Sequence, residues 1–197
     1  MTLLTTVQED THSFSDDFAD FENISSKYQS AIASDDYKKM LDLFDRSQKI
    51  YVIANGGLHY VGSHMATDMT RLVPGKVLKS FDSFGFITSN ANDHGWENIF
   101  VRWLETSAIL DNPSNTLVYG MSCSGNSKNV INAFAYAHEK YGFKTALLSG
   151  RKSKLRPQFT HELTFGCEYY HTVECLSLML FYDMVHKLGH CCPSINR

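Results

Sequence analysis

A run of small hydroxyl and amide residues lies between an apolar segment and a helical segment near the middle of the chain. Residues 115–121 are apolar enough for a buried strand, and residues 129–141 have apolar side chains at helical spacing. Such a turn presents unpaired backbone N–H groups and the positive end of a helix, and hydroxyls add further donors. We expect it to bind phosphate, although serine and asparagine there also serve simply as helix caps. The candidate phosphate-binding residues are Ser122, Cys123, Ser124, Asn126 and Ser127.

A second turn of the same kind follows an earlier apolar segment. Residues 49–54 predict a strand, Asn55, Gly56 and Gly57 follow, and residues 58–72 have helical periodicity. Open α/β sheets bind ligands where the carboxyl ends of neighbouring strands meet, so the two turns are expected to hold one ligand. Neither turn has the glycine pattern of a dinucleotide site or the Lys-Ser/Thr ending of a nucleoside triphosphate loop. A small phosphorylated metabolite therefore fits better than a nucleotide.

Ionisable side chains on two helices are candidates for acid–base chemistry. His64 and Asp68 lie four residues apart on one helical face, where they can share a metal ion or a substrate hydroxyl, or form an ordinary surface pair. Glu174 lies in a C-terminal helical segment, 172–188, whose other residues are almost all apolar. It can act as a general base or simply pair with a cation.

Three blocks of polar and glycine residues occur in succession along the chain. They are Asn55-Gly56-Gly57 with His64 and Asp68, then Asn92-Asp93-His94-Gly95, then Ser122-Cys123-Ser124-Gly125-Asn126-Ser127-Lys128-Asn129. In this order they resemble the motifs of the sugar isomerase (SIS) domain. The Asn-Asp-x-Gly block is typical of its phosphoheptose (sedoheptulose 7-phosphate) isomerase branch. The resemblance covers residues 37–188.

The resemblance implies a zinc site whose ligands this chain keeps only in part. In phosphoheptose isomerases, a His and a Glu at the positions of His64 and Asp68 are joined by a Gln and a second His on the C-terminal helix. Those last two positions hold Val173 and Phe181 here, and neither side chain can bind zinc. We therefore expect no metal and no other cofactor; zinc remains the alternative, with His171, Glu174 or His59 as a replacement ligand. His64, Asp68 and Glu174 remain as the catalytic candidates.

An aldose–ketose isomerase moves a proton between adjacent sugar carbons, so it needs a base and groups that stabilise the enediolate. The resemblance implies that the sugar binds at Asn55, Gly56, Gly57 and Asp93, although Asn-Asp-x-Gly is also a common turn sequence. Two functions stay open. One is a ketose–aldose phosphate isomerase of the sedoheptulose 7-phosphate type, and the other is a non-catalytic protein that binds a sugar phosphate for regulation or docking.

The alternation of segments predicts a single α/β domain. We expect strands at 49–54, 76–80, 116–121, 144–149 and 162–165, with helices at 18–32, 35–44, 58–72, 97–109, 127–141 and 172–188. This order predicts a parallel sheet of about five strands with helices on both faces, a flavodoxin-like three-layer sandwich. The SIS domain is expected over residues 17–190, with a flexible segment at 1–16 and a tail at 191–197.

Composition disfavours several other partners. The 18 Lys and Arg residues and 21 Asp and Glu residues leave a net charge of −3, which does not suit nucleic acid or an anionic membrane. No apolar run approaches transmembrane length, and the first residues lack the features of a signal peptide, so we expect a cytoplasmic protein. The five cysteines have no zinc-finger spacing and suit a reducing compartment.

The C-terminal helical segment also bears on assembly. Residues 173–185 are apolar on nearly every face, whereas the surface helix of a monomer keeps a wide polar stripe. We expect this helix to be deeply buried or shared with another subunit. The resemblance implies a homotetramer with active sites across subunit boundaries, and a dimer is the alternative.

Overall fold

The computed structural model describes residues 21–195 and contains one five-stranded sheet with helices on both faces. The strands are β1 (Lys49–Ala54), β2 (Val77–Ser80), β3 (Thr116–Ser122), β4 (Lys144–Ser149) and β5 (His161–Thr164). The helices are α1 (Phe21–Ala33), α2 (Asp35–Arg46), α3 (Gly56–Leu72), α4 (Phe84–His94), η2 (Trp96–Asn98), α5 (Ile99–Ser107), α6 (Lys128–Tyr141) and α7 (Tyr170–Lys187). The expected α/β sandwich is confirmed.

All strands are parallel, in the order β2-β1-β3-β4-β5. The chain moves outward from β1 to β2, then returns to place β3 on the other side of β1, so the connections diverge between β1 and β3. In doubly wound folds, this switch point opens a crevice at the carboxyl ends of the strands. Because Ala54 is paired with Met121 at the end of the register, the two predicted turns emerge side by side.

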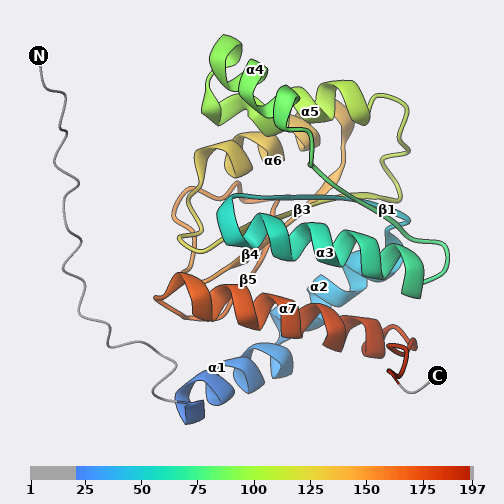
Figure 1. Cartoon of the computed structure of the whole chain (residues 1–197), viewed down its shortest axis with the longest axis vertical. Helices are drawn as coiled ribbons and strands as arrows, with labels where there is room; N and C mark the ends of the chain where they lie inside the picture. The colour runs from blue at the N-terminus through green and yellow to red at the C-terminus, as the bar shows by residue number, and fades with distance from the viewer. Residues whose placement is uncertain (1–20, 196–197) are drawn as a thin grey trace, which may run out of the picture.

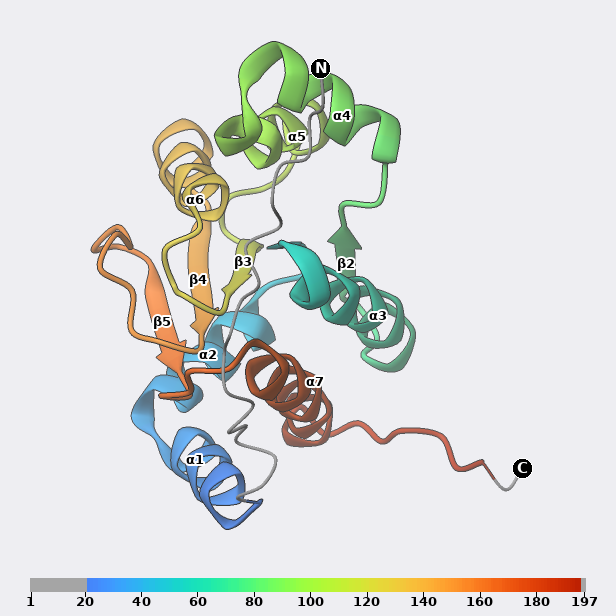
Figure 2. The same ribbon diagram turned by 60° about the vertical axis from the view of Figure 1, so that its left-hand side comes forward.

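Two hydrophobic cores lie on opposite faces of the sheet. Neighbouring residues of β1 alternate between them, since Ile50 and Val52 pack with α2, α3 and α7, while Tyr51 and Ile53 pack with α5 and α6. This is the period of two that a strand imposes on its side chains. Figures 1 and 2 show α4, α5 and α6 on one side of the sheet and α1, α2, α3 and α7 on the other.

The secondary structure of residues 84–95 differs from the expectation. Helix α4 was not expected, because it has no buried residue and so leaves no apolar periodicity in the sequence. The Asn92-Asp93 segment, expected as a turn, forms the last turn of this helix, and Gly95 follows it at φ 82°. The remaining elements agree within about three residues. The expected segment 1–16 lies outside the described residues.

Helix α7 buries eight of its 18 residues within its own chain. Val173, Leu176 and Phe181 are at most 1% exposed, and the opposite face leaves Met179 half exposed. Tyr37 of α2 donates a hydrogen bond to Asp183, which joins the C-terminal part of α7 to α2. Among residues 21–195, no helix combines the length and apolar character needed to cross a bilayer.

Candidate active site at the carboxyl edge of the sheet

The hydroxyl-rich turn after β3 forms a compact cluster. The Oγ atom of Ser122 lies 2.9 Å from Ser127 Oγ and 3.5 Å from Ser124 Oγ. Ser127 is the residue before α6, yet its hydroxyl accepts no hydrogen bond from an N–H group of residues 128–141. The capping alternative is therefore not what this serine does. Its hydroxyl faces the other serines at the positive end of α6, an arrangement suited to an anion.

A reciprocal pair of amides joins this turn to the turn after β1. Asn55 Nδ2 donates to Asn129 Oδ1 at 2.9 Å, and Asn129 Nδ2 donates to Asn55 Oδ1 at 2.8 Å. Asn129 also accepts from the N–H group of Val130, so it is 1% exposed and fully engaged. Asn55, expected to bind substrate, thus holds the two turns in register. The signal for Asn129 was present in the third sequence block, but its role depends on a contact 74 residues away.

Glu174 of α7 contacts the turn after β1. A Cβ atom at Gly57 would lie 2.2 Å from Glu174 Oε1, so the carboxylate rests directly on the backbone at the start of α3. The same carboxylate also acts on Cys123 of the hydroxyl turn. Burial, and then the negative charge of Glu174, raise the pKa of the Cys123 thiol to about 12. The Cys123 thiol is therefore neutral at ordinary pH, and Glu174 is a carboxylate that lies close to both turns.

His64 and Asp68 form a separate polar cluster between α3 and α7. The Tyr182 hydroxyl lies 2.9 Å from His64 Nε2 and donates to Asp68 Oδ2 at 2.8 Å, while Arg71 donates to Asp68 Oδ1 at 2.9 Å. Burial, and then the hydrogen bond to Asp68, raise the pKa of Tyr182 to about 12. Asp68 lies eleven residues beyond Gly57, which is about 16 Å along the helix axis. Within one chain, the catalytic candidates His64 and Asp68 are therefore remote from Glu174.

The residues of this chain do not fit the family's zinc ion. Val173 and Phe181, at two expected ligand positions, are at most 1% exposed and pack in the hydrophobic core. His64 Nε2 lies 3.7 Å from Asp68 Oδ2, and the Tyr182 hydroxyl is hydrogen-bonded to both side chains. In the part of the chain that the structure describes, no group of three or more His, Cys, Asp or Glu residues is placed to hold a metal ion.

Asp93, the remaining expected sugar ligand, lies on the exposed surface of α4. Its Oδ1 atom accepts a hydrogen bond of 2.8 Å from the adjacent Asn92. Below α4, a cavity of about 170 Å³ opens beside Asn55 and Gly56. Its walls include the aromatic rings of Phe81 and Trp96. Because sugar rings expose apolar C–H faces, this cavity offers packing surface next to the two polar turns.

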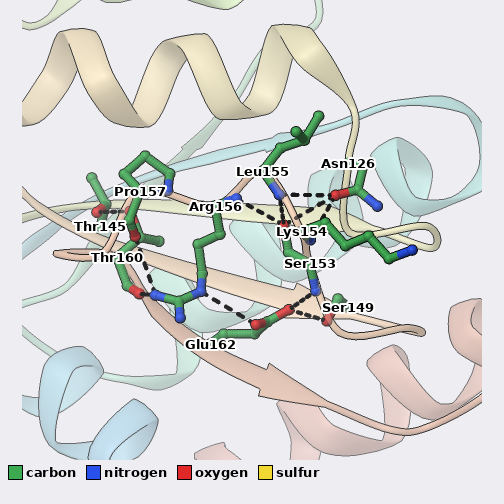
Figure 3. Close-up of polar contacts among 10 residues, drawn as sticks. All are labelled: Asn126, Thr145, Ser149, Ser153, Lys154, Leu155, Arg156, Pro157, Thr160 and Glu162. Carbon is green, nitrogen blue, oxygen red and sulfur yellow. Dashed lines mark hydrogen bonds and ion pairs between the residues drawn. The ribbon is translucent and has the colours of Figure 1, made fainter.

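Asn126, expected to bind phosphate, has its amide oxygen committed to the loop between β4 and β5. Its Oδ1 atom accepts from Lys154 N–H at 2.9 Å, from Leu155 N–H at 3.2 Å and from the Ser153 hydroxyl at 3.3 Å. Figure 3 shows these three bonds converging on one oxygen. The residue therefore joins the hydroxyl turn to a second loop. The sequence of this loop carries no motif, so its contact with the hydroxyl turn was not predicted.

The strand order places this chain among doubly wound α/β folds, and solved phosphoheptose isomerases share its fold. No protein-family model matches the sequence. The phosphoheptose isomerase of Helicobacter pylori (strain HPAG1) is 32% identical over 124 residues, a match that covers 59% of this chain and 62% of the relative. The match thus spans about three fifths of the length of such curated relatives.

Solved structures agree with this sequence similarity. The phosphoheptose isomerase from Neisseria gonorrhoeae superimposes with a TM-score of 0.74 at 22% identity, covering 87% of this chain and 96% of that protein. The phosphoheptose isomerase from Francisella tularensis gives a TM-score of 0.71 at 18% identity, covering 87% and 93%. The chain is therefore similar to phosphoheptose isomerases in sequence and shares their fold.

Proposed function

We propose that this protein is a ketose–aldose phosphate isomerase of the sedoheptulose 7-phosphate isomerase type. The observation that carries the proposal is the position of Glu174, a carboxylate resting on Gly57 and facing Cys123 of the hydroxyl turn. One substrate can therefore place its phosphate on the turn and its reacting carbons near a base. The similarity to curated phosphoheptose isomerases supports this reaction class.

Each part of the site has a role in this proposal. The hydroxyls of Ser122, Ser124 and Ser127 bind the phosphate at the positive end of α6. Glu174 removes the proton from the hydroxyl-bearing carbon and returns it to the adjacent carbonyl carbon, while a second proton moves from the hydroxyl oxygen to the carbonyl oxygen through the enediol. The N–H groups at the start of α3, beside Gly57, stabilise the negative oxygen of the enediolate. The apolar cavity beside Asn55 receives the carbon chain of the sugar.

We propose that catalysis proceeds without zinc, in a cytoplasmic homotetramer. A zinc site requires at least three protein ligands, and Tyr182 engages the two family positions that remain. In an assembly, His64 and Asp68 can serve a neighbouring subunit's site, which accounts for their distance from Glu174. Elemental analysis of the purified protein is expected to find no stoichiometric zinc, and about one zinc per chain would contradict this part of the proposal.

A panel of ketose phosphates, assayed by NMR with and without a chelator, tests the function directly. We expect turnover of at least one member, insensitive to the chelator. Changing Ser124 and Ser127 to alanine together removes two donors to a charged group and should weaken phosphate binding about 100-fold. The control is Ser114→Ala, because Ser114 precedes β3 at the opposite edge of the sheet. Unchanged binding in the double variant would place the phosphate elsewhere.

A non-catalytic sugar-phosphate binder is the second candidate. It is favoured by the replacement of two expected ligands by core residues, Val173 and Phe181, together with the Tyr182 bridge between His64 and Asp68. This candidate predicts sugar-phosphate binding with no turnover of any ketose phosphate. Turnover that is lost in Glu174→Gln, with phosphate affinity retained, would exclude it.

A further inference from the structure

The hydroxyl turn, residues 122–127, contains no positively charged side chain, and the next residue, Lys128, is the first of α6. Its donors are the hydroxyls of Ser122, Ser124 and Ser127 and the N–H groups at the start of α6, all of which are neutral. A phosphate monoester carries close to two negative charges at neutral pH. Charge-assisted hydrogen bonds to an anion are about twice as strong as neutral ones. A cation next to this turn would therefore add substantially to phosphate affinity.

The loop between β4 and β5, residues 150–160, is fastened along this turn. Arg151 N–H donates to the Cys123 carbonyl oxygen at 3.1 Å, and the two backbones approach so closely that a Cβ atom at Gly125 would lie 2.6 Å from Arg151 O. Asn126 Oδ1 then accepts from the N–H group of Lys154. The position of the loop is thus set by direct contact with the hydroxyl turn.

The loop is held from its other side by a half-buried ion pair. Glu162 of β5 accepts at Oε1 from Ser149 Oγ and from Ser153 N–H, both at 2.8 Å, and its Oε2 atom lies 3.2 Å from Arg156 Nε. The Glu162 side chain is only 6% exposed. Figure 3 shows Glu162 and Asn126 gripping opposite sides of the same loop. A loop fixed at both sides can present a side chain at a constant place.

Of the loop's four cations, two are already paired. Arg151 lies 3.2 Å from Glu168, and Arg156 pairs with Glu162. Within residues 21–195, Lys152 and Lys154 have no ion pair. Lys154 is the one whose backbone N–H group is bonded to the hydroxyl turn, and Figure 3 shows its side chain extending beneath Asn126.

We propose that Lys154 supplies the positive charge for the phosphate group, and that Asn126 is a positioning residue that places it there. This inference rests on the proposed function, since it takes the hydroxyl turn as the phosphate site. The Lys154 ammonium donates a hydrogen bond to one phosphate oxygen, while the serine hydroxyls of the turn donate to the other phosphate oxygens. Asn126 acts through its amide oxygen on the loop and contributes no ligand from that atom.

The test is to measure the affinity of the full-length protein for inorganic phosphate by calorimetry at two salt concentrations. We expect Lys154→Gln to weaken binding fivefold to tenfold, on the scale of one exposed charge-assisted contact. The residual binding should also depend less on salt, because one ionic contact is gone. Lys154→Arg keeps the charge and should retain most of the affinity. Asn126→Ala should reproduce the loss, since the loop is then free to move.

Two matched variants decide whether the effect belongs to Lys154. Lys152→Gln removes a cation from the same loop, and Lys128→Gln removes the cation at the first residue of α6. Both should leave the affinity within about twofold. An equal loss in either variant, or no loss in Lys154→Gln, would overturn the proposal. Failure of the proposed isomerase activity is distinguishable, because it would abolish turnover of every ketose phosphate and leave the affinities of these variants for inorganic phosphate unchanged.

Discussion

A single methyl group at Gly57 tests whether the Glu174 carboxylate is placed for chemistry. In the structure, a Cβ atom at this position would lie 2.2 Å from Glu174 Oε1, 2.4 Å from Cδ and 2.6 Å from Oε2. Ordinary carbon–oxygen contacts are longer than 3 Å, so the two groups cannot coexist. The end of a glutamate side chain is flexible, whereas the start of α3 is held by the sheet. The carboxylate is therefore the group that moves in Gly57→Ala.

The size of the effect follows from this displacement. Restoring an ordinary contact of about 3.4 Å requires the carboxylate oxygen to retreat by about 1 Å. A misplacement of that size costs about 100-fold in rate when the displaced group takes part in proton transfer. Stability should change little or rise, because alanine is a better helix former than glycine by about 1 kcal/mol. We therefore expect a folded protein with greatly reduced turnover.

Three measurements on Gly57→Ala make the prediction specific. Turnover of the best ketose phosphate should fall about 100-fold, while the melting temperature and the affinity for inorganic phosphate stay close to those of the unmodified protein. The control is Gly85→Ala in α4, where an added Cβ atom meets nothing within 4 Å. Unimpaired turnover in Gly57→Ala would refute the assignment of Glu174 as the base. A comparable loss in Gly85→Ala would show that the assay reports helix substitution in general.

Four further predictions concern groups that the fold buries or pairs. The pKa of the Cys123 thiol is raised to about 12 by burial and then by Glu174, so the thiol should react slowly with iodoacetamide at pH 8. Glu174→Gln should speed this reaction. An unchanged rate would mean that the two groups are not neighbours. The Tyr119 hydroxyl is buried without a hydrogen-bond partner among residues 21–195, so Tyr119→Phe should raise the free energy of unfolding by about 1 kcal/mol, as measured with urea; a destabilised variant would reveal a missing partner. The Lys76 ammonium donates hydrogen bonds to three carbonyl oxygens at the end of α2. Lys76→Met should therefore lower the free energy of unfolding by about 2–3 kcal/mol in the same assay. An unchanged free energy would refute this capping role. The pKa of Tyr182 is raised to about 12 by burial and then by its carboxylate partner, Asp68. The hydroxyl therefore contributes fully to stability below pH 10, and this contribution is lost as the pH rises towards 12. The difference in the free energy of unfolding between the unmodified protein and Tyr182→Phe should shrink over that window, and a constant difference would contradict this prediction.

The sequence alone predicted the sheet and the two turns, because each rests on local patterns. Apolar runs ending in small polar residues predict buried parallel strands and the turns after them, and parallel strands must place such turns at one edge. Helix α4 escaped prediction, since a helix with no buried residue has no apolar stripe. Its one local signal was Ser83, whose hydroxyl accepts the Phe86 N–H group as an N-terminal cap.

Only the tertiary structure decided how the candidate residues are grouped. Helical spacing correctly placed His64 and Asp68 on one face, but it could not show that Tyr182, 114 residues beyond Asp68, is hydrogen-bonded to both. The sequence likewise contained Glu174 and Gly57 without any indication that they touch. Contacts between distant segments depend on how helices pack across the sheet, and that packing is decided by the whole core. The chemistry of each residue was therefore readable from the sequence, whereas the membership of the site was a property of the fold.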